Sequence, residues 1–253
     1  MNSLKKLMRR FLQMFGLAVY RYSNDIYDED GLRSIHNHDF IMNPSFGAAY
    51  DRGLLASGDD YNWRWRVHVG LWAADCASKL EGDFVECGVN KGFLSSSVMK
   101  FLDWNKLNKT FYLLDTFKGI DLRFVSEQEL GTNNFIQDQH KFYIDGVESV
   151  RKNFAEWQRV KIIVGAVPET LGQVDSDSVA FLHIDMNCVP PEVAAFNYFW
   201  DKMVPGGIIL LDDYAYKNRE LQKKAMDEVA AQKNVMILSL PTGQGLILKP
   251  SRQ

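Results

Sequence analysis

The chain has 253 residues, enough to bury a core in one large domain or two small ones. Its composition is that of a globular protein, with 46% hydrophobic and 24% charged residues, and its net charge of -3 gives no general basic surface for nucleic acid. The three cysteines, Cys76, Cys87 and Cys188, lack a CxxC spacing and predict reduced thiols in a cytoplasmic protein. No apolar run approaches the roughly 20 residues that a membrane-spanning helix needs.

The N-terminal segment 1–22 predicts an amphipathic helix. Its apolar residues recur at helical spacing, and its basic residues have no acidic neighbour before Asp25. The segment lacks the small-residue cleavage site of a signal peptide. One interpretation, which we favour from sequence alone, is a helix packed on the body or on a second subunit of a homo-oligomer. The other is a basic helix that lies on an anionic membrane and makes the protein membrane-associated.

Residues 24–60 predict an arm or lid, because Asp, Asn, Gly and His dominate there, with one short helix near Phe46 to Leu55. Residues 61–80 predict a helix, since Trp65, His68, Leu71 and Trp72 recur at helical steps.

From residue 82 onward, predicted strands alternate with predicted helices. The strands are 83–87, 110–117, 160–166, 178–185, 206–213, 234–240 and 244–250, the helices are 93–104, 146–157, 190–203 and 218–232, and 120–144 is a polar insertion. Apolar strands that alternate with helices indicate a parallel sheet covered on both faces, whereas the short turn between the last two strands requires an antiparallel hairpin. The sequence therefore predicts an α/β fold with a doubly wound, mostly parallel seven-stranded sheet, an antiparallel C-terminal hairpin and an N-terminal helical arm.

The first strand, DFVEC, carries Glu86 and opens into a turn that contains Gly88 and Gly92. In a doubly wound sheet, ligands bind at the carboxyl ends of strands, and glycine lets the backbone approach them closely. Glu86 would repel a pyrophosphate, and the GxGxxG spacing of nicotinamide-dependent enzymes is absent. An acid suits a cation such as the α-ammonium of S-adenosylmethionine (SAM), and Asp115 at the next strand end suits ribose hydroxyls. A tight turn without a ligand is the structural alternative.

With these features, the stretches GDFVECGVNKGFLS, FYLLDTFKGI, FLHIDMN and MVPGGIILLDDY resemble the seven-stranded SAM-dependent methyltransferases. More narrowly, they resemble the macrocin/mycinamicin/novobiocin sugar O-methyltransferases, the TylF-like family, over roughly residues 60–250. The resemblance implies an N-terminal helix and lid arm (1–60) that closes over a Rossmann-like methyltransferase domain (61–253). The cofactor site that we assign on this basis consists of Glu86, Gly88, Gly92, Ser95, Asp115, Thr116, Gly165, Val167 and Asp185.

Three acids end neighbouring strands, namely Asp185 in HIDMN and Asp212 and Asp213 in LLDDY. Carboxylates this close repel one another unless a cation or protons intervene, and hard oxygen ligands suit Mg²⁺. The resemblance implies the same metal, because equivalent acids in the family hold Mg²⁺, which grips neighbouring sugar hydroxyls. We therefore predict a metal site at Asp185, Asp212 and Asp213; the alternative is that Asp212 or Asp213 caps the next helix and binds nothing.

One residue departs from the family pattern, which typically reads Asp-x-Asp here and uses the second acid as a proposed general base. This chain has Asp185-Met186-Asn187, and Asn187 cannot take a proton. Either a lid residue such as His36 or His38 substitutes, or the metal acidifies the hydroxyl, or the acceptor differs. Our candidate catalytic residues are Asp185, Asp213 and His38.

The leading hypothesis is a SAM-dependent O-methyltransferase that uses Mg²⁺ and methylates a hydroxyl of a sugar or glycosylated small molecule. One alternative is a metal-independent methyltransferase of the same fold that acts on another small acceptor. Another is a SAM-binding protein without catalysis, which the Asn187 replacement leaves open. The identity of the acceptor is not predicted by the sequence.

Overall fold

The structure is a computed structural model that describes residues 2–19, 26–132, 143 and 146–251. The chain forms two compact units, Met1–His38 and Asp39–Gln253. The first unit contains helix α1 (Asn2–Met14), which confirms the helix predicted within 1–22. It also contains two short antiparallel strands that the sequence did not predict, β1 (Tyr27–Glu29) and β2 (Leu32–Ser34).

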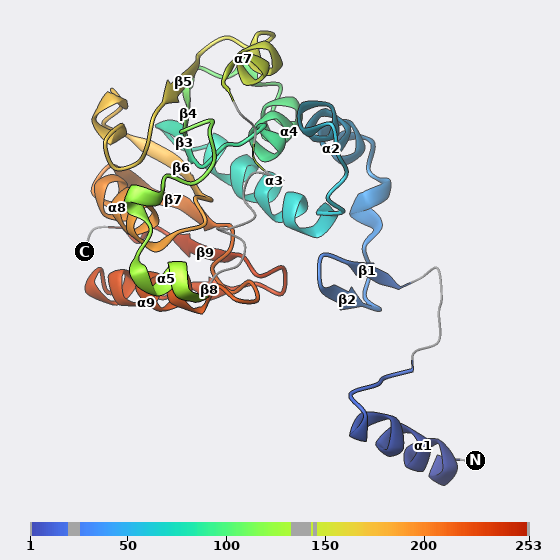
Figure 1. Ribbon diagram of the computed structural model, residues 1–253. Coiled ribbons are helices and arrows are strands. Elements are labelled where there is room, and N and C mark those ends of the chain that lie inside the picture. The colour runs from blue at the N-terminus through green and yellow to red at the C-terminus, as the bar shows by residue number, and fades with distance from the viewer. Residues whose placement is uncertain (1, 20–25, 133–142, 144–145, 252–253) are drawn as a thin grey trace. The chain divides into compact units, whose positions relative to one another are not determined.

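The second unit is built on one seven-stranded sheet in the order β5-β4-β3-β6-β7-β9-β8 (Figure 1). Five strands are parallel, β9 pairs antiparallel with β7, and β8 pairs antiparallel with β9. The bounds are β3 (Asp83–Cys87), β4 (Phe111–Asp115), β5 (Val160–Val164), β6 (Val179–Ile184), β7 (Met203–Leu211), β8 (Leu238–Ser239) and β9 (Gly245–Leu248). The predicted doubly wound sheet and its antiparallel hairpin are confirmed, although β8 is much shorter than the predicted strand 234–240.

Helices cover both faces of the sheet. Side chains alternate along each strand, so Phe84 and Leu113 face one hydrophobic cluster while Val85 and Leu114 face the other. The first cluster includes residues of α2 (Pro44–Ser57), α3 (Arg64–Ser78), α4 (Phe93–Phe101) and α7 (Glu148–Phe154), and the second includes residues of α8 (Val189–Trp200) and α9 (Glu220–Gln232). Burial on both faces explains why the strands read as continuous apolar runs.

Residues 39–60 belong to the second unit, although the sequence predicted them as part of the arm formed by residues 24–60. They form a 3-10 turn, η1 (Asp39–Met42), and helix α2, which is longer than the predicted helix. Asn43 caps α2 because its side chain accepts hydrogen bonds from the backbone of Ser45 and Phe46. The helix contacts α4 at Gly53, where a Cβ atom would lie 2.5 Å from Ser97 Oγ. The division of the chain into functional parts at residue 60 stays a prediction.

The polar insertion 120–144 contains η3 (Leu122–Phe124) and α5 (Glu127–Thr132). Its residues 133–142 and 144 lie outside the described part of the chain. Two further 3-10 turns are η2 (Trp104–Lys106) and η5 (Leu171–Gln173). Within the residues that the structure describes, no helix is both long and apolar enough to cross a bilayer.

Candidate active site

Two cavities meet at the carboxyl ends of the parallel strands. A cavity of about 60 Å³ is lined by residues that follow β4 and β5, and a larger one of about 340 Å³ lies beside β6 and β7. Both are lined by Gly88, Asp115, Tyr143 and Asp185. The position agrees with the rule that ligands of doubly wound sheets bind outside the strand ends.

The glycine turn is required by the packing of the protein itself. Gly88 has φ of +93°, and a Cβ atom there would lie 1.9 Å from the carbonyl oxygen of Asp185. Gly92 has φ of +83°, and its Cβ atom would lie 2.5 Å from the ring of Phe154. Asp115 holds the same turn, since its Oδ2 accepts hydrogen bonds of 2.7 Å from the backbone N–H groups of Val89 and Asn90. The turn therefore positions the strand ends β3, β4 and β6 relative to one another.

A buried histidine joins two acids across the floor of the larger cavity. His183 Nδ1 lies 2.8 Å from Glu86 Oε1, and its Nε2 lies 3.7 Å from Asp212 Oδ1. Burial opposes a charge on the imidazole, but Asp212 and Glu86 outweigh it and raise the pKa of His183 to about 10. The other oxygen of Glu86, Oε2, is buried and has no hydrogen-bond partner among the described residues. An acceptor in this position suits a ligand cation.

Arg66 of α3 supplies positive charge to the two acids after β7. Its Nη1 donates to Asp212 Oδ2 at 2.6 Å and to the Asp212 carbonyl oxygen at 2.9 Å, and it lies 3.5 Å from Asp213 Oδ1. The Arg66 side chain is 5% exposed and also donates to the Thr242 carbonyl oxygen. Burial raises the pKa of Asp212, but Arg66 and His183 outweigh it and hold that pKa well below its usual range.

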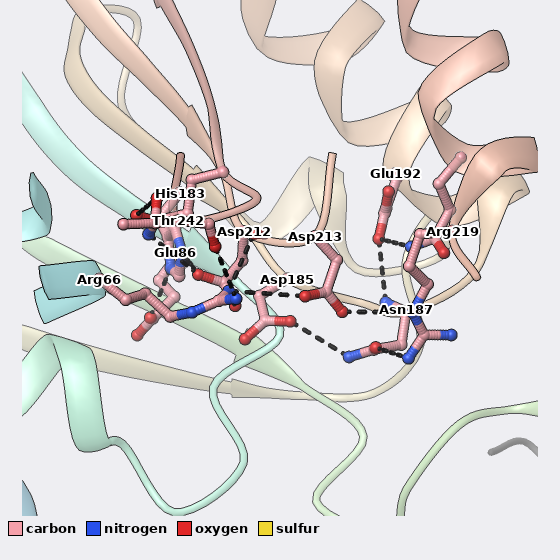
Figure 2. A network of polar contacts seen from close by, with 12 residues as sticks. Arg66, Glu86, His183, Asp185, Asn187, Glu192, Asp212, Asp213, Arg219 and Thr242 are labelled. Atoms are coloured by element: carbon pink, nitrogen blue, oxygen red, sulfur yellow. Dashed lines mark hydrogen bonds and ion pairs between the residues drawn. The ribbon is translucent and has the colours of Figure 1, made fainter. Parts of the chain in front are cut away.

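Arg219, just before α9, contacts the other side of the acid pair (Figure 2). Its Nε lies 3.4 Å from Asp213 Oδ2, and its Nη2 donates to Asn187 Oδ1 at 2.6 Å. Because arginine can only donate, the Asn187 oxygen faces Arg219, and the amide nitrogen donates to Asp185 Oδ1 at 3.1 Å. Asn187 is thus a fixed donor to Asp185.

Asp185 is partly buried and lies beside the other two acids. Burial and the charges of Asp212 and Asp213 raise its pKa well above the usual range, although His183 and Arg66 act in the opposite direction. Asp212 and Asp213 have arginine partners, whereas the hydrogen bond that the structure gives to the Asp185 carboxylate comes from the Asn187 amide.

Glu192 supports Asn187 from the first turn of α8. Its Oε1 accepts from the backbone N–H of Asn187 and from Gln222 Nε2, each at 2.9 Å. Asn187 has φ of +62°, a left-handed conformation that asparagine tolerates better than most residues. Burial raises the pKa of Glu192 to about 8, although its hydrogen bond from Gln222 favours the charged form.

The predicted Mg²⁺ site is not supported by this arrangement. Asp185, Asp212 and Asp213 come together as expected, but Arg66 and Arg219 neutralise two of them. In the described ranges, no group of three or more His, Cys, Asp or Glu side chains is placed to hold a metal ion. The metal site stays a prediction; the sequence did not reveal that arginines from two other elements reach the acids.

The other predicted site residues are distributed as follows. The larger cavity is lined by Glu86, Gly88, Asp115, Asp185, Asp212 and Asp213, and the smaller one by Gly88, Asp115, Thr116, Gly165, Val167 and Asp185. Gly92 precedes α4, and Ser95 is buried within it; neither appears in the lining of these cavities. His38 belongs to the N-terminal unit, where its Nδ1 lies 3.0 Å from the His36 carbonyl oxygen. The roles of these residues stay predictions.

The sequence did not predict most of the residues that line the larger cavity. They include Tyr61, Trp63, Arg66, Phe93, Tyr216 and Arg219. Trp63 packs against the first hydrophobic cluster and also lines the cavity, and Trp72 is 49% exposed. Arg66 contacts Tyr216, its guanidinium carbon lying 5.1 Å from the ring centre. The alternation of Trp63, Arg64, Trp65 and Arg66 was the one sequence signal that could have drawn attention to this wall.

The strand order, the glycine turn and the acidic strand ends define the Rossmann-like fold of the SAM-dependent methyltransferases. Residues 72–237 match the family model of the macrocin O-methyltransferases (TylF), and the chain belongs to this family. No curated protein matches the chain significantly.

Two solved structures illustrate the shared fold. The O-methyltransferase NovP is 18% identical with a TM-score of 0.66, and the match covers 85% of this chain and 100% of NovP. The calicheamicin methyltransferase CalS11 is 16% identical with a TM-score of 0.56, and the match covers 90% of this chain and 99% of CalS11. At these identities the similarity concerns the fold alone.

Proposed function

We propose that this protein transfers a methyl group from SAM to a hydroxyl of a sugar or of a sugar-bearing small molecule, without a bound metal. The observation that carries the proposal is the position of Asp185, whose side chain lies where the two cavities meet. Membership in the macrocin O-methyltransferase family supports both the reaction and the class of acceptor.

The smaller cavity suits the adenosine half of SAM. Its walls include Leu114, Ile120, Phe124, Ala166 and Val167, which are apolar and would cover a base. In the larger cavity, Glu86 Oε2, which has no hydrogen-bond partner among the described residues, suits the α-ammonium of the cofactor. When bound, SAM supplies an electrophilic methyl group on a sulfonium centre.

The larger cavity suits a sugar. Tyr61, Trp63 and Tyr216 provide aromatic faces for the C–H groups of a pyranose ring, and buried carboxylates and guanidinium groups provide hydrogen bonds for its hydroxyls. A cavity of about 340 Å³ is of the size used by small-molecule ligands.

Asp185 is the general base in this proposal. The acceptor hydroxyl must lose its proton as its oxygen bonds to the methyl carbon and the carbon–sulfur bond breaks. Asp212 and Asp213 are held by Arg66 and Arg219, whereas Asp185 is oriented by the neutral amide of Asn187. Asp185 in its ionised form therefore accepts the proton, and its raised pKa makes that carboxylate a stronger base than an ordinary one. The two arginines supply the positive charge that a metal would otherwise bring to this edge of the sheet.

The test uses isotopically labelled SAM and a panel of glycosides and phenols, with SAM binding measured in parallel by calorimetry. We expect the wild type to bind SAM and to methylate sugar hydroxyls. Asp185→Asn should retain most of the affinity for SAM but lose about 10²–10⁴-fold in turnover. Asp177→Asn, at a fully exposed carboxylate, is the control and should change neither value.

Three other outcomes would each contradict part of the proposed function. Absence of SAM binding would contradict the proposed function. Methylation of phenols but not of sugars would refute the acceptor class, and binding without turnover on any hydroxyl would favour the SAM-binding protein that lacks catalysis.

A further inference from the structure

Helix α1 has an exposed apolar face. Leu7, Met8, Phe11, Met14 and Phe15 follow helical spacing, and their side chains are between 57% and 80% exposed. The rings of Phe11 and Phe15 lie 5.1 Å apart in an edge-to-face contact, so the two aromatic groups form one surface feature. Exposure of this many large apolar side chains on a single helix is typical of a binding surface.

The opposite face of α1 is basic. At 100° per residue, Lys5, Lys6, Arg9 and Arg10 fall on the arc that the apolar residues leave free, and all four side chains are exposed. Residues 2–19 contain no acidic side chain to balance this charge. The helix therefore combines a bulky apolar face with an uncompensated positive face, which is the pattern of helices that lie in a membrane interface.

The charge favours a lipid surface over a second copy of α1. Apposition of two such helices by their apolar faces would leave all eight basic side chains, four on each helix, without an anionic partner. An anionic bilayer instead offers negative headgroups beside an apolar interior, so both faces find a partner. At 13 residues, α1 is about 20 Å long, and its charges place it along the interface.

We propose that α1 binds the surface of anionic membranes, with Phe11 and Phe15 inserted at the headgroup boundary and the basic residues on the headgroups. This inference revises the preference for protein docking that sequence alone suggested. It does not rest on the proposed reaction.

The test is co-sedimentation of the full-length protein with vesicles of phosphatidylcholine alone or with about one-third phosphatidylserine. We expect strong binding to the anionic vesicles only, weakened by high salt. Each basic residue near an anionic surface strengthens binding about fivefold, so Arg9→Gln with Arg10→Gln should weaken it roughly twenty-five-fold. Phe11→Ser with Phe15→Ser should weaken it by about tenfold or more.

The control is Met236→Ser, which removes an exposed apolar side chain from the second unit and should bind like the wild type. Circular dichroism verifies that every variant is folded. Equal binding to neutral and anionic vesicles, or unchanged binding after the double Phe replacement, would refute the proposal. So would a dimer in sedimentation velocity that the Phe replacements dissolve while no vesicle binding is seen.

Discussion

The amide nitrogen of Asn187 lies 3.1 Å from Asp185 Oδ1, and Arg219 fixes the amide so that this nitrogen faces the carboxylate. The residue that stands where the family typically has a second acid is therefore a donor directed at the first acid. Glu192 adds a second restraint by accepting a hydrogen bond from the Asn187 backbone. The chain therefore lacks one candidate base, and the hydrogen bonds of Asn187 orient the other candidate, Asp185.

Asn187→Asp tests whether the amide matters as a donor. An aspartate could still pair with Arg219, but it could not donate to Asp185 and would add a like charge beside it. We expect kcat/KM to fall by about tenfold or more, the equivalent of one hydrogen bond to a charged group. Asn218→Asp, at an exposed asparagine that also has a positive φ, is the control. A rise in kcat/KM would show that the introduced carboxylate acts as a base and that the Asn187 amide does not position Asp185.

Arg66→Met tests the charge compensation of Asp212. The substitution keeps an apolar stem but leaves a buried carboxylate without its arginine partner. We expect a loss of about 3–5 kcal/mol in the free energy of unfolding, measured by urea denaturation. Arg64→Met on the same helix breaks an ion pair with Asp60 whose side chains are 24% and 36% exposed, so it should cost less than about 1 kcal/mol. Similar losses for both variants would contradict the structural role of Arg66.

Metal dependence follows from the same contacts. Because the arginines already neutralise Asp212 and Asp213, wild-type turnover should be unchanged by EDTA, and Mn²⁺ binding should be undetectable by paramagnetic resonance at micromolar metal. Arg66→Met frees the carboxylate of Asp212, so this variant should gain Mn²⁺ binding. Loss of wild-type activity in EDTA with recovery in Mg²⁺ would instead show that the protein requires the metal that the family resemblance implies.

The sheet could be predicted from the sequence because both of its faces are buried. Strands such as β4 and β6 are largely apolar, with His183 as the exception in β6. Asp115 at the end of β4 and Asp185 just after β6 then fall at one edge of the sheet by topology alone. The length of α2 was missed even though Asn43 followed by Pro44 is a recognisable helix start.

The arginines could not be predicted in the same way. Arg64 and Arg66 lie two positions apart on α3, yet Arg64 forms an accessible ion pair while Arg66 is buried against Asp212. Which of the two turns inward depends on how α3 packs on the sheet, and that packing has no local signature. The acid cluster predicted a positively charged partner, and the structure places two guanidinium groups beside it, which the sequence alone could not distinguish from a metal.

Glu192 provides a test by pH. Burial raises the pKa of its carboxyl from 4.5 to about 8 in the folded protein, so the folded state binds more protons than the unfolded state between these values. The stability of the wild type should accordingly fall as the pH rises from about 4.5 to about 8, by roughly 4 kcal/mol from this group. Glu192→Gln keeps an acceptor for Asn187 and Gln222 but has no proton to lose, so this part of the slope should disappear.

The measurement is urea denaturation of the wild type and of Glu192→Gln at several pH values from 5 to 9. The difference between the two unfolding free energies should grow in favour of the variant as the pH rises, and should level off above the pKa of about 8. Glu228→Gln, at an exposed carboxylate on the same helix as Gln222, should follow the wild-type curve. Parallel curves for the wild type and Glu192→Gln across this range would mean that Glu192 is charged in the folded protein, with Arg219 as the nearest cation to compensate it.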